Sequence, residues 1–137
     1  MWKFILFLLA IVVGAPLCNL SQFVSEQPSA PPVTVALQGD AVRGEEIFKH
    51  GLNEAPPCST CHALVKGSFS LGPVMTGISE RAATRIPGMT AEEYLHQSIV
   101  SPSAYLVSGY RDIMYPQFAD HLNEQDIADL IAYLSTL

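Results

Sequence analysis

The last part of the chain carries apolar side chains at helical spacing. Asn123 is a good helix cap, acidic residues follow it at the positively charged start of a helix, and Leu122 and Ile127 could form a hydrophobic staple. The apolar residues that then share one helical face are Ile127, Leu130, Ile131, Leu134 and Leu137. The pattern predicts an amphipathic helix from about residue 124 to the end of the chain.

Two earlier segments also begin with helix signals. Asp40 can cap a short amphipathic stretch at residues 42–48. Thr90, with Glu93 three positions later, forms the pattern of a capping box at the start of a second helix. Residues 78–85 give a weaker helical pattern. Helices are therefore expected at all three places.

Residues 51–77 are rich in glycine and proline and show no helical period. A compact domain rarely contains so long a loop unless the loop encloses something. No alternating strand pattern of useful length appears in the chain. The sequence thus predicts an all-α domain over residues 39–137, with three to five helices and long loops.

Residues 1–20 form an apolar segment in front of this domain. Only Lys3 is charged, and such a segment indicates an export signal or a retained membrane anchor. As a helix it would reach roughly 28 Å, which barely spans a bilayer core. Cys18 would allow lipidation, but Leu17 stands where a small residue is expected. A retained anchor, with the following domain on the periplasmic side, is the favoured prediction.

Residues 21–38 contain Pro28, Pro31 and Pro32 and predict an extended linker. The whole chain has 137 residues, enough for one such domain, and a formal net charge of −6. No run of basic residues occurs, so nucleic-acid binding is not expected.

The stretch EAPPCSTCHALVKG carries the clearest chemistry. Cys58 and Cys61 have two residues between them and His62 follows directly, which is the pattern of covalent haem attachment. Each thiol can bond one vinyl group of the porphyrin, and the histidine is then held next to the iron as an axial ligand. A haem would also account for the long loops, because it would become the centre of the core.

Three other uses of the two cysteines fit the sequence less well. A thioredoxin-like redox pair would need a βαβ setting, which the pattern does not show. A zinc site would need two further ligands at suitable spacing. A disulfide across two residues would be strained and would leave the histidine unexplained. One covalent haem c is therefore the predicted cofactor.

Around this motif the sequence resembles the class I c-type cytochromes. The resemblance covers residues 39–137 and is carried by the motif together with GDAVRGEEIF, LGP, MYPQF and IADLIAYL. It implies the class I cytochrome c fold, in which the first and last helices cross closely. Gly44 and Phe48 match the contact positions of the first helix, and Leu130 and Tyr133 match those of the last.

The same resemblance implies roles for residues near the haem. The carbonyl of Pro73 is expected to accept a hydrogen bond from His62. Met114 matches the methionine that serves as the second axial ligand, although Tyr115 stands between it and the proline that usually follows directly. Tyr110 is the first choice for binding a haem propionate. The other candidates for that role are Tyr105, Arg81, Arg85 and Arg111.

The remaining methionines and histidines receive other expectations. Met75 is expected in the core against the haem, and Met89 in a loop. His121 is the strongest rival ligand, placed at the start of the last helix. His50 and His96 are expected on helix surfaces.

The functional expectation is one-electron transfer, not enzymatic catalysis, by a membrane-tethered monohaem cytochrome with His62 and Met114 on the iron. The expected partners are redox proteins, most simply subunits of a respiratory or photosynthetic, quinol-oxidising membrane complex. The alternative is a haem-c sensor or a peroxidase-type enzyme in which the sixth ligand leaves the iron.

Overall fold

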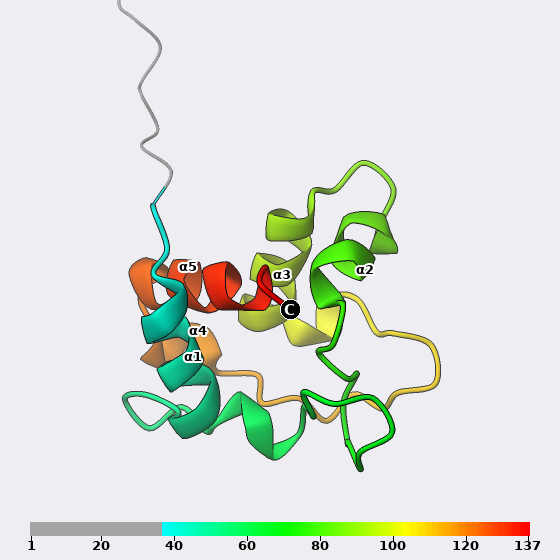
Figure 1. The fold of residues 1–137 in the computed structure, drawn as a ribbon, viewed down its shortest axis with the longest axis horizontal. Helices are drawn as coiled ribbons and strands as arrows, with labels where there is room; N and C mark the ends of the chain where they lie inside the picture. The colour runs from blue at the N-terminus through cyan, green and yellow to red at the C-terminus, as the bar shows by residue number, and fades with distance from the viewer. Residues whose placement is uncertain (1–36) are drawn as a thin grey trace, which may run out of the picture. The chain divides into compact units, whose positions relative to one another are not determined.

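The computed structural model describes residues 37–137. Within this range the chain forms five α-helices, two short 3₁₀-helices and one isolated β-bridge (Figure 1). The elements in chain order are α1 (Ala41–His50), η1 (Cys58–Thr60), α2 (Ile78–Arg85), α3 (Ala91–Val100), η2 (Pro102–Ala104), α4 (Phe118–His121) and α5 (Glu124–Leu134). The prediction of an all-α domain with three to five helices is confirmed.

The helix starts follow the capping signals. The Asp40 carboxylate accepts hydrogen bonds from the first backbone N–H groups of α1. Both halves of the capping box between Thr90 and Glu93 are present at α3. Asn123 caps α5 and forms a second box with Asp126, which the sequence analysis did not identify. Local side-chain chemistry therefore fixes where these helices begin.

Two expectations about the end of the chain were wrong in detail. Helix α5 ends at Leu134, so Leu137 lies beyond the helix whose apolar face it was expected to extend. His121 lies at the end of a separate short helix, α4, and not at the start of α5. Four residues are too few to show a helical period in the sequence, so α4 was not predicted.

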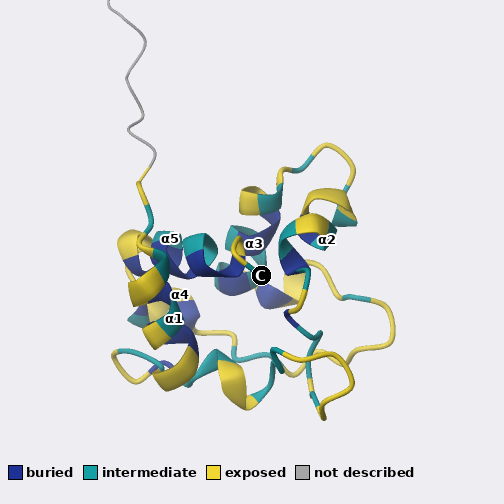
Figure 2. Cartoon of the chain, in the orientation of Figure 1, coloured by how far each residue is buried: buried dark blue, intermediate teal, exposed yellow. Residues whose placement is uncertain are grey.

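Helices α1 and α5 pack tightly against each other. A β-carbon added to Gly44 would lie 1.9 Å from the carbonyl oxygen of Asp129, so only glycine permits this approach. The rings of Phe48 and Tyr133 lie 5.5 Å apart by centroid, and Leu130 of α5 is buried. The expected crossing is confirmed, and Figure 2 shows buried positions along α5.

A charged cluster at the same crossing was not predicted. Arg43 of α1 forms ion pairs with both Asp126 and Asp129 of α5. Only 1% of the surface of each aspartate is exposed. Asp129 also accepts hydrogen bonds of 2.8 Å from the backbone N–H of Asp40 and from the side chain of Gln125. These contacts compensate the burial of two carboxylates.

The apolar segment at residues 1–20 and most of the linker at 21–38 lie outside the described residues. The anchor and the linker therefore remain predictions. From residue 37 onward, none of the helices combines the length and the apolar character that a membrane crossing requires.

Candidate haem site

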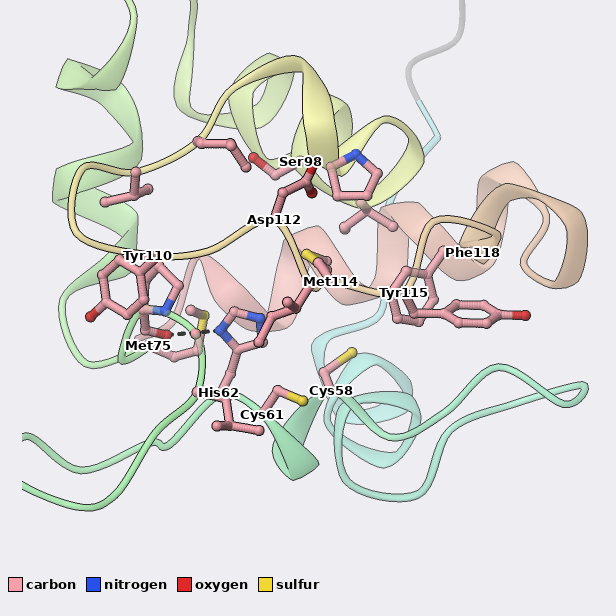
Figure 3. A pocket seen from close by; sticks show the side chains of 18 of the residues that line it. Cys58, Cys61, His62, Met75, Ser98, Tyr110, Asp112, Met114, Tyr115 and Phe118 are labelled. Carbon is pink, nitrogen blue, oxygen red and sulfur yellow. Dashed lines mark hydrogen bonds between the residues drawn. The ribbon is translucent and has the colours of Figure 1, made fainter.

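A pocket opens between α2, α3 and the long loops, lined largely by apolar side chains (Figure 3). Its lining begins at Pro56 and ends at Phe118, so neither α1 nor α5 contributes to it. Six residues that the sequence singled out for the haem site line this one pocket: Cys58, Cys61, His62, Pro73, Tyr110 and Met114. The fold thus brings together residues from three separate stretches of chain.

The two cysteines lie on one tight turn. Cys58 begins the 3₁₀-helix η1, and its carbonyl oxygen accepts hydrogen bonds from the backbone N–H groups of Cys61 (3.1 Å) and His62 (3.0 Å). Both thiols are free. The turn therefore presents two thiols and an imidazole to the pocket over five residues.

The Cys58 thiol is buried, and burial sets its protonation state. Burial raises the pKa of its thiol to about 11, so the group is protonated at neutral pH. Disulfide exchange and metal binding both use the thiolate and favour a lowered pKa. In residues 37–137 no cluster of three or more His, Cys, Asp or Glu side chains could hold a metal ion.

His62 has a fixed orientation and tautomer. Its Nδ1 lies 2.8 Å from the carbonyl oxygen of Pro73, which can only accept, so Nδ1 carries the proton and donates (Figure 3). Burial lowers the pKa of His62 below its ordinary value, and the hydrogen bond to Pro73 opposes this only in part. The ring is therefore neutral, and the Nε2 lone pair remains free for a metal.

The loop after the motif holds the His62 ring closely. A β-carbon on Gly72 would lie 2.5 Å from Cε1 of His62. Ser70 fixes the loop, because its hydroxyl accepts from the N–H of Ala63 and donates towards the carbonyl oxygens of Cys61 and Gly72. Sequence reasoning missed Ser70, since a serine in a glycine-rich loop gives no distinctive signal.

Met114 lines the same pocket as the cysteine motif. It is half-buried and lines the pocket from the segment before α4, and Figure 3 shows it and His62 extending towards the same space. Met75 is buried and lines the pocket too, as expected of a core residue against the haem. Met89 does not line the pocket.

The other histidines lie outside the pocket lining. His50 and His96 sit on helices α1 and α3 and only approach exposed glutamates. His121, the rival ligand, has its Nε2 2.8 Å from the hydroxyl of Tyr115. His62 is thus the one histidine among residues 37–137 that lines the pocket.

The candidates for binding propionates divide into two groups. Arg81 does not line the pocket and donates instead to the backbone carbonyls of Val74 and Thr76. Four others do line it: Arg85, Tyr105, Tyr110 and Arg111. The Nε atom of Arg85 is buried and has no hydrogen-bond partner in the part of the chain described here. A buried N–H without an acceptor indicates a missing acceptor, such as a carboxylate of a bound group.

These features fit a haem held by two thioether bonds. The pocket offers paired thiols on one turn, a neutral imidazole with a free Nε2, a thioether side chain and an arginine N–H in need of an acceptor. Its largely apolar lining suits a flat, mostly apolar ring system.

Comparison with known proteins agrees with this geometry. A family model described as Cytochrome c matches residues 41–137. A cytochrome c-553-like protein of Synechocystis sp. is 33% identical, over 86% of this chain and 88% of that protein. Cytochrome c2 iso-1 of Rhodospirillum centenum is 30% identical, over 72% of this chain and 96% of its own. Cytochrome c2 of Blastochloris viridis is also 30% identical, over 77% and 84% of the two chains.

The matched region contains every residue of the pocket described above. The family attaches its haem through the motif that Cys58, Cys61 and His62 form here. The chain therefore belongs to the cytochrome c family and is a class I c-type cytochrome, an electron-transfer protein with one covalently bound haem c.

Proposed function

We propose that this cytochrome carries single electrons with its iron held between His62 and Met114. The observation that supports this most strongly is the hydrogen bond from His62 Nδ1 to Pro73, which leaves Nε2 free in the pocket that Met114 also lines. The two side chains come from segments far apart in sequence and meet at one site. Two protein ligands would leave no position for a substrate.

Haem c supplies one-electron exchange between Fe(III) and Fe(II). The chain would tune this exchange in two ways. The thioether of Met114 is a soft, neutral donor that favours the reduced metal and raises the reduction potential. The apolar lining, including the buried Met75 and Ile99, keeps water out and disfavours the extra positive charge of the oxidised state.

The proposal includes a membrane tether. The uncharged stretch at residues 4–17 would anchor the chain, and the proline-containing linker at 21–38 would let the haem domain move on the periplasmic side. Tethering raises the effective concentration of the haem domain for membrane-bound donors and acceptors. This suits a carrier or a subunit of a quinol-oxidising or photosynthetic complex.

The test of the ligands is the absorption spectrum of oxidised holoprotein. Bonding of Met114 to the iron should give a weak far-red band, and Met114→Ala should abolish it. Met89→Ala is the matched control, because Met89 packs on the core outside the pocket, and it should retain the band. A band that survives Met114→Ala would contradict the assignment. Full binding of CO to the untreated reduced protein would favour the sensor alternative.

The test of the tether is separate. The intact mass of the full chain purified from membranes should equal the uncleaved polypeptide plus one haem. Alkaline washing should leave the protein in the membrane fraction. Release by the wash, or a mass that lacks residues 1–20, would contradict the anchor without affecting the ligand assignment.

A further inference from the structure

Tyr115 is held on both its ring and its hydroxyl. The hydroxyl lies 2.8 Å from Nε2 of His121, within hydrogen-bonding distance. The ring packs edge-on against Phe118 at a centroid distance of 5.1 Å and an interplanar angle of 79° (Figure 3). Phe118 is itself buried, with 5% of its surface exposed. Tyr115 is thus fixed to both ends of the short helix α4.

The backbone around Tyr115 is also restricted. Pro116 follows it directly, and a residue before proline is confined mainly to extended conformations. Met114 precedes it, so any rotation of Tyr115 about its backbone would move the methionine. The additional residue between Met114 and Pro116 would make this segment longer and looser if its side chain were not fastened.

The partner of Tyr115 is fastened in turn. The carbonyl oxygen of His121 accepts a hydrogen bond of 3.2 Å from the side chain of Asn53. Asn53 belongs to the loop that leads into Cys58. His121 therefore connects two parts of the pocket wall. Its ring contacts Tyr115, next to Met114, and its carbonyl contacts the loop that leads into the cysteine turn.

We propose that Tyr115 is a positioning residue for the iron ligand: through His121 and Phe118 it holds the segment that presents Met114 to the pocket. The inference rests on the proposed ligation by Met114. A thioether is a weak, neutral ligand. The fraction of protein with Met114 bonded to the iron therefore falls when the loop must lose much conformational freedom to form this bond. A fastened Tyr115 removes that freedom in advance.

The proposal predicts how external ligands compete with Met114. Loss of the hydroxyl in Tyr115→Phe keeps the ring on Phe118 but removes the hydrogen bond to His121. The segment should then release the iron more readily, and imidazole should bind the oxidised holoprotein with a Kd about 3- to 10-fold lower than in the wild type, as expected from the loss of one hydrogen bond. The far-red band should persist in the absence of imidazole.

The control and the double variant separate positioning from general destabilisation. Tyr133→Phe removes a hydroxyl from a buried tyrosine of α5, outside the pocket lining, and should leave the imidazole Kd unchanged. His121→Ala should lower the Kd by about the same factor as Tyr115→Phe. The double variant should add little more, because both changes remove the same hydrogen bond.

The outcomes distinguish this inference from the ligand assignment. An imidazole Kd in Tyr115→Phe within twofold of the wild type, with the band still lost in Met114→Ala, would overturn the role of Tyr115 alone. Additive effects of the two single variants would overturn it too. A wild-type protein without the far-red band would overturn the ligand assignment and this role with it. Should Tyr115→Phe fail to fold, His121→Ala decides the question by the same measurement, because it leaves the packing of Tyr115 on Phe118 intact.

Discussion

Gly44 of α1 packs directly against the carbonyl group of Asp129 of α5. A β-carbon at position 44 would come within 1.9 Å of that oxygen and 2.9 Å of Cβ of Tyr133. The neighbours are backbone and the base of a side chain, which cannot move aside as the end of a long side chain could. The contact therefore sets the separation of the two helices.

Replacing Gly44 by alanine should separate these helices. Alanine normally stabilises a helix relative to glycine, by about 1 kcal/mol. Here the steric clash should outweigh that gain and lower the free energy of unfolding by about 2–3 kcal/mol. Urea denaturation of the holoprotein measures the change. Glu46→Ala, on an exposed position of the same helix, should change stability by no more than about 0.5 kcal/mol, and an equal loss in both variants would refute the packing explanation.

Arg43 should contribute more to stability than an ordinary surface arginine. Arg43→Gln leaves Asp126 and Asp129 buried without their cation and should cost about 2 kcal/mol. This is less than for a fully buried pair, because the side chain of Arg43 is 45% exposed and solvent screens it. Lys49→Gln removes the solvent-exposed pair with Glu45 on the same helix and should cost much less than Arg43→Gln. Equal costs in urea denaturation would contradict the prediction.

Asp129 should make the stability depend on acid pH. Burial alone would raise its pKa, but hydrogen bonds from Asp40, Arg43 and Gln125 outweigh burial and hold the pKa below its ordinary value. As the pH falls below about 4, the unfolded chain therefore takes up a proton at this site before the folded chain does. The contribution of Asp129 is complete above that pH and is lost as the pH falls through the lower, folded-state pKa.

The measurement is the free energy of unfolding of wild type and Asp129→Asn from pH 6 to pH 2.5. The Asp129→Asn variant should be clearly less stable than the wild type at pH 6. The difference in the free energy of unfolding should shrink as the pH falls and the wild-type carboxylate becomes protonated. A difference that stays constant or grows on acidification would show that the sign is wrong.

Gly72→Ala should disturb His62 directly. The new methyl group would lie 2.5 Å from Cε1 of the imidazole, so the ring would have to move away from Pro73. We expect a lower yield of covalently attached haem and, in the protein that forms, a weaker far-red band. Gly67→Ala is the matched control, because it lies in the same loop with φ of +91° and nothing near its β-carbon. It should lose some stability from backbone strain and keep the spectrum of the wild type.

Arg85→Met should lower the reduction potential. Arg85 lines the pocket with a buried Nε that has no partner among residues 37–137, so its charge lies close to the bound group. Removing a positive charge there stabilises the more positive, oxidised iron by on the order of 1 kcal/mol. Redox titration should show this shift for Arg85→Met and a much smaller one for Lys66→Met, whose side chain lies in an exposed loop outside the lining. Identical shifts would mean that Arg85 acts only as part of the overall charge.

The parts of the fold that could be predicted are those encoded by neighbouring residues. Asp40, Thr90 and Asn123 cap helices by bonding to N–H groups two or three positions away, and such signals survive in a single sequence. The cysteine motif is equally local, because one turn of chain fixes the spacing of Cys58, Cys61 and His62.

What could not be predicted depends on contacts between distant residues. The ion pair between Arg43 and Asp129 joins positions 86 apart, and the sequence around neither residue indicates the partner. Aspartates are rarely buried, so the sequence pattern gave no reason to expect that Asp126 and Asp129 would be buried in the folded protein. The hydrogen bond between the side chains of Tyr115 and His121 depends on α4, and this helix is too short to show a helical period in the sequence.

The separation between the α1–α5 interface and the pocket has a consequence for assembly of the protein. The interface is closed by protein atoms alone, whereas the pocket is complete only with its prosthetic group. Before haem attachment the paired helices α1 and α5 should therefore be better protected from amide hydrogen exchange than the loops that line the pocket. Looser pocket loops would leave the thiols of Cys58 and Cys61 accessible for the bonds that attach the haem.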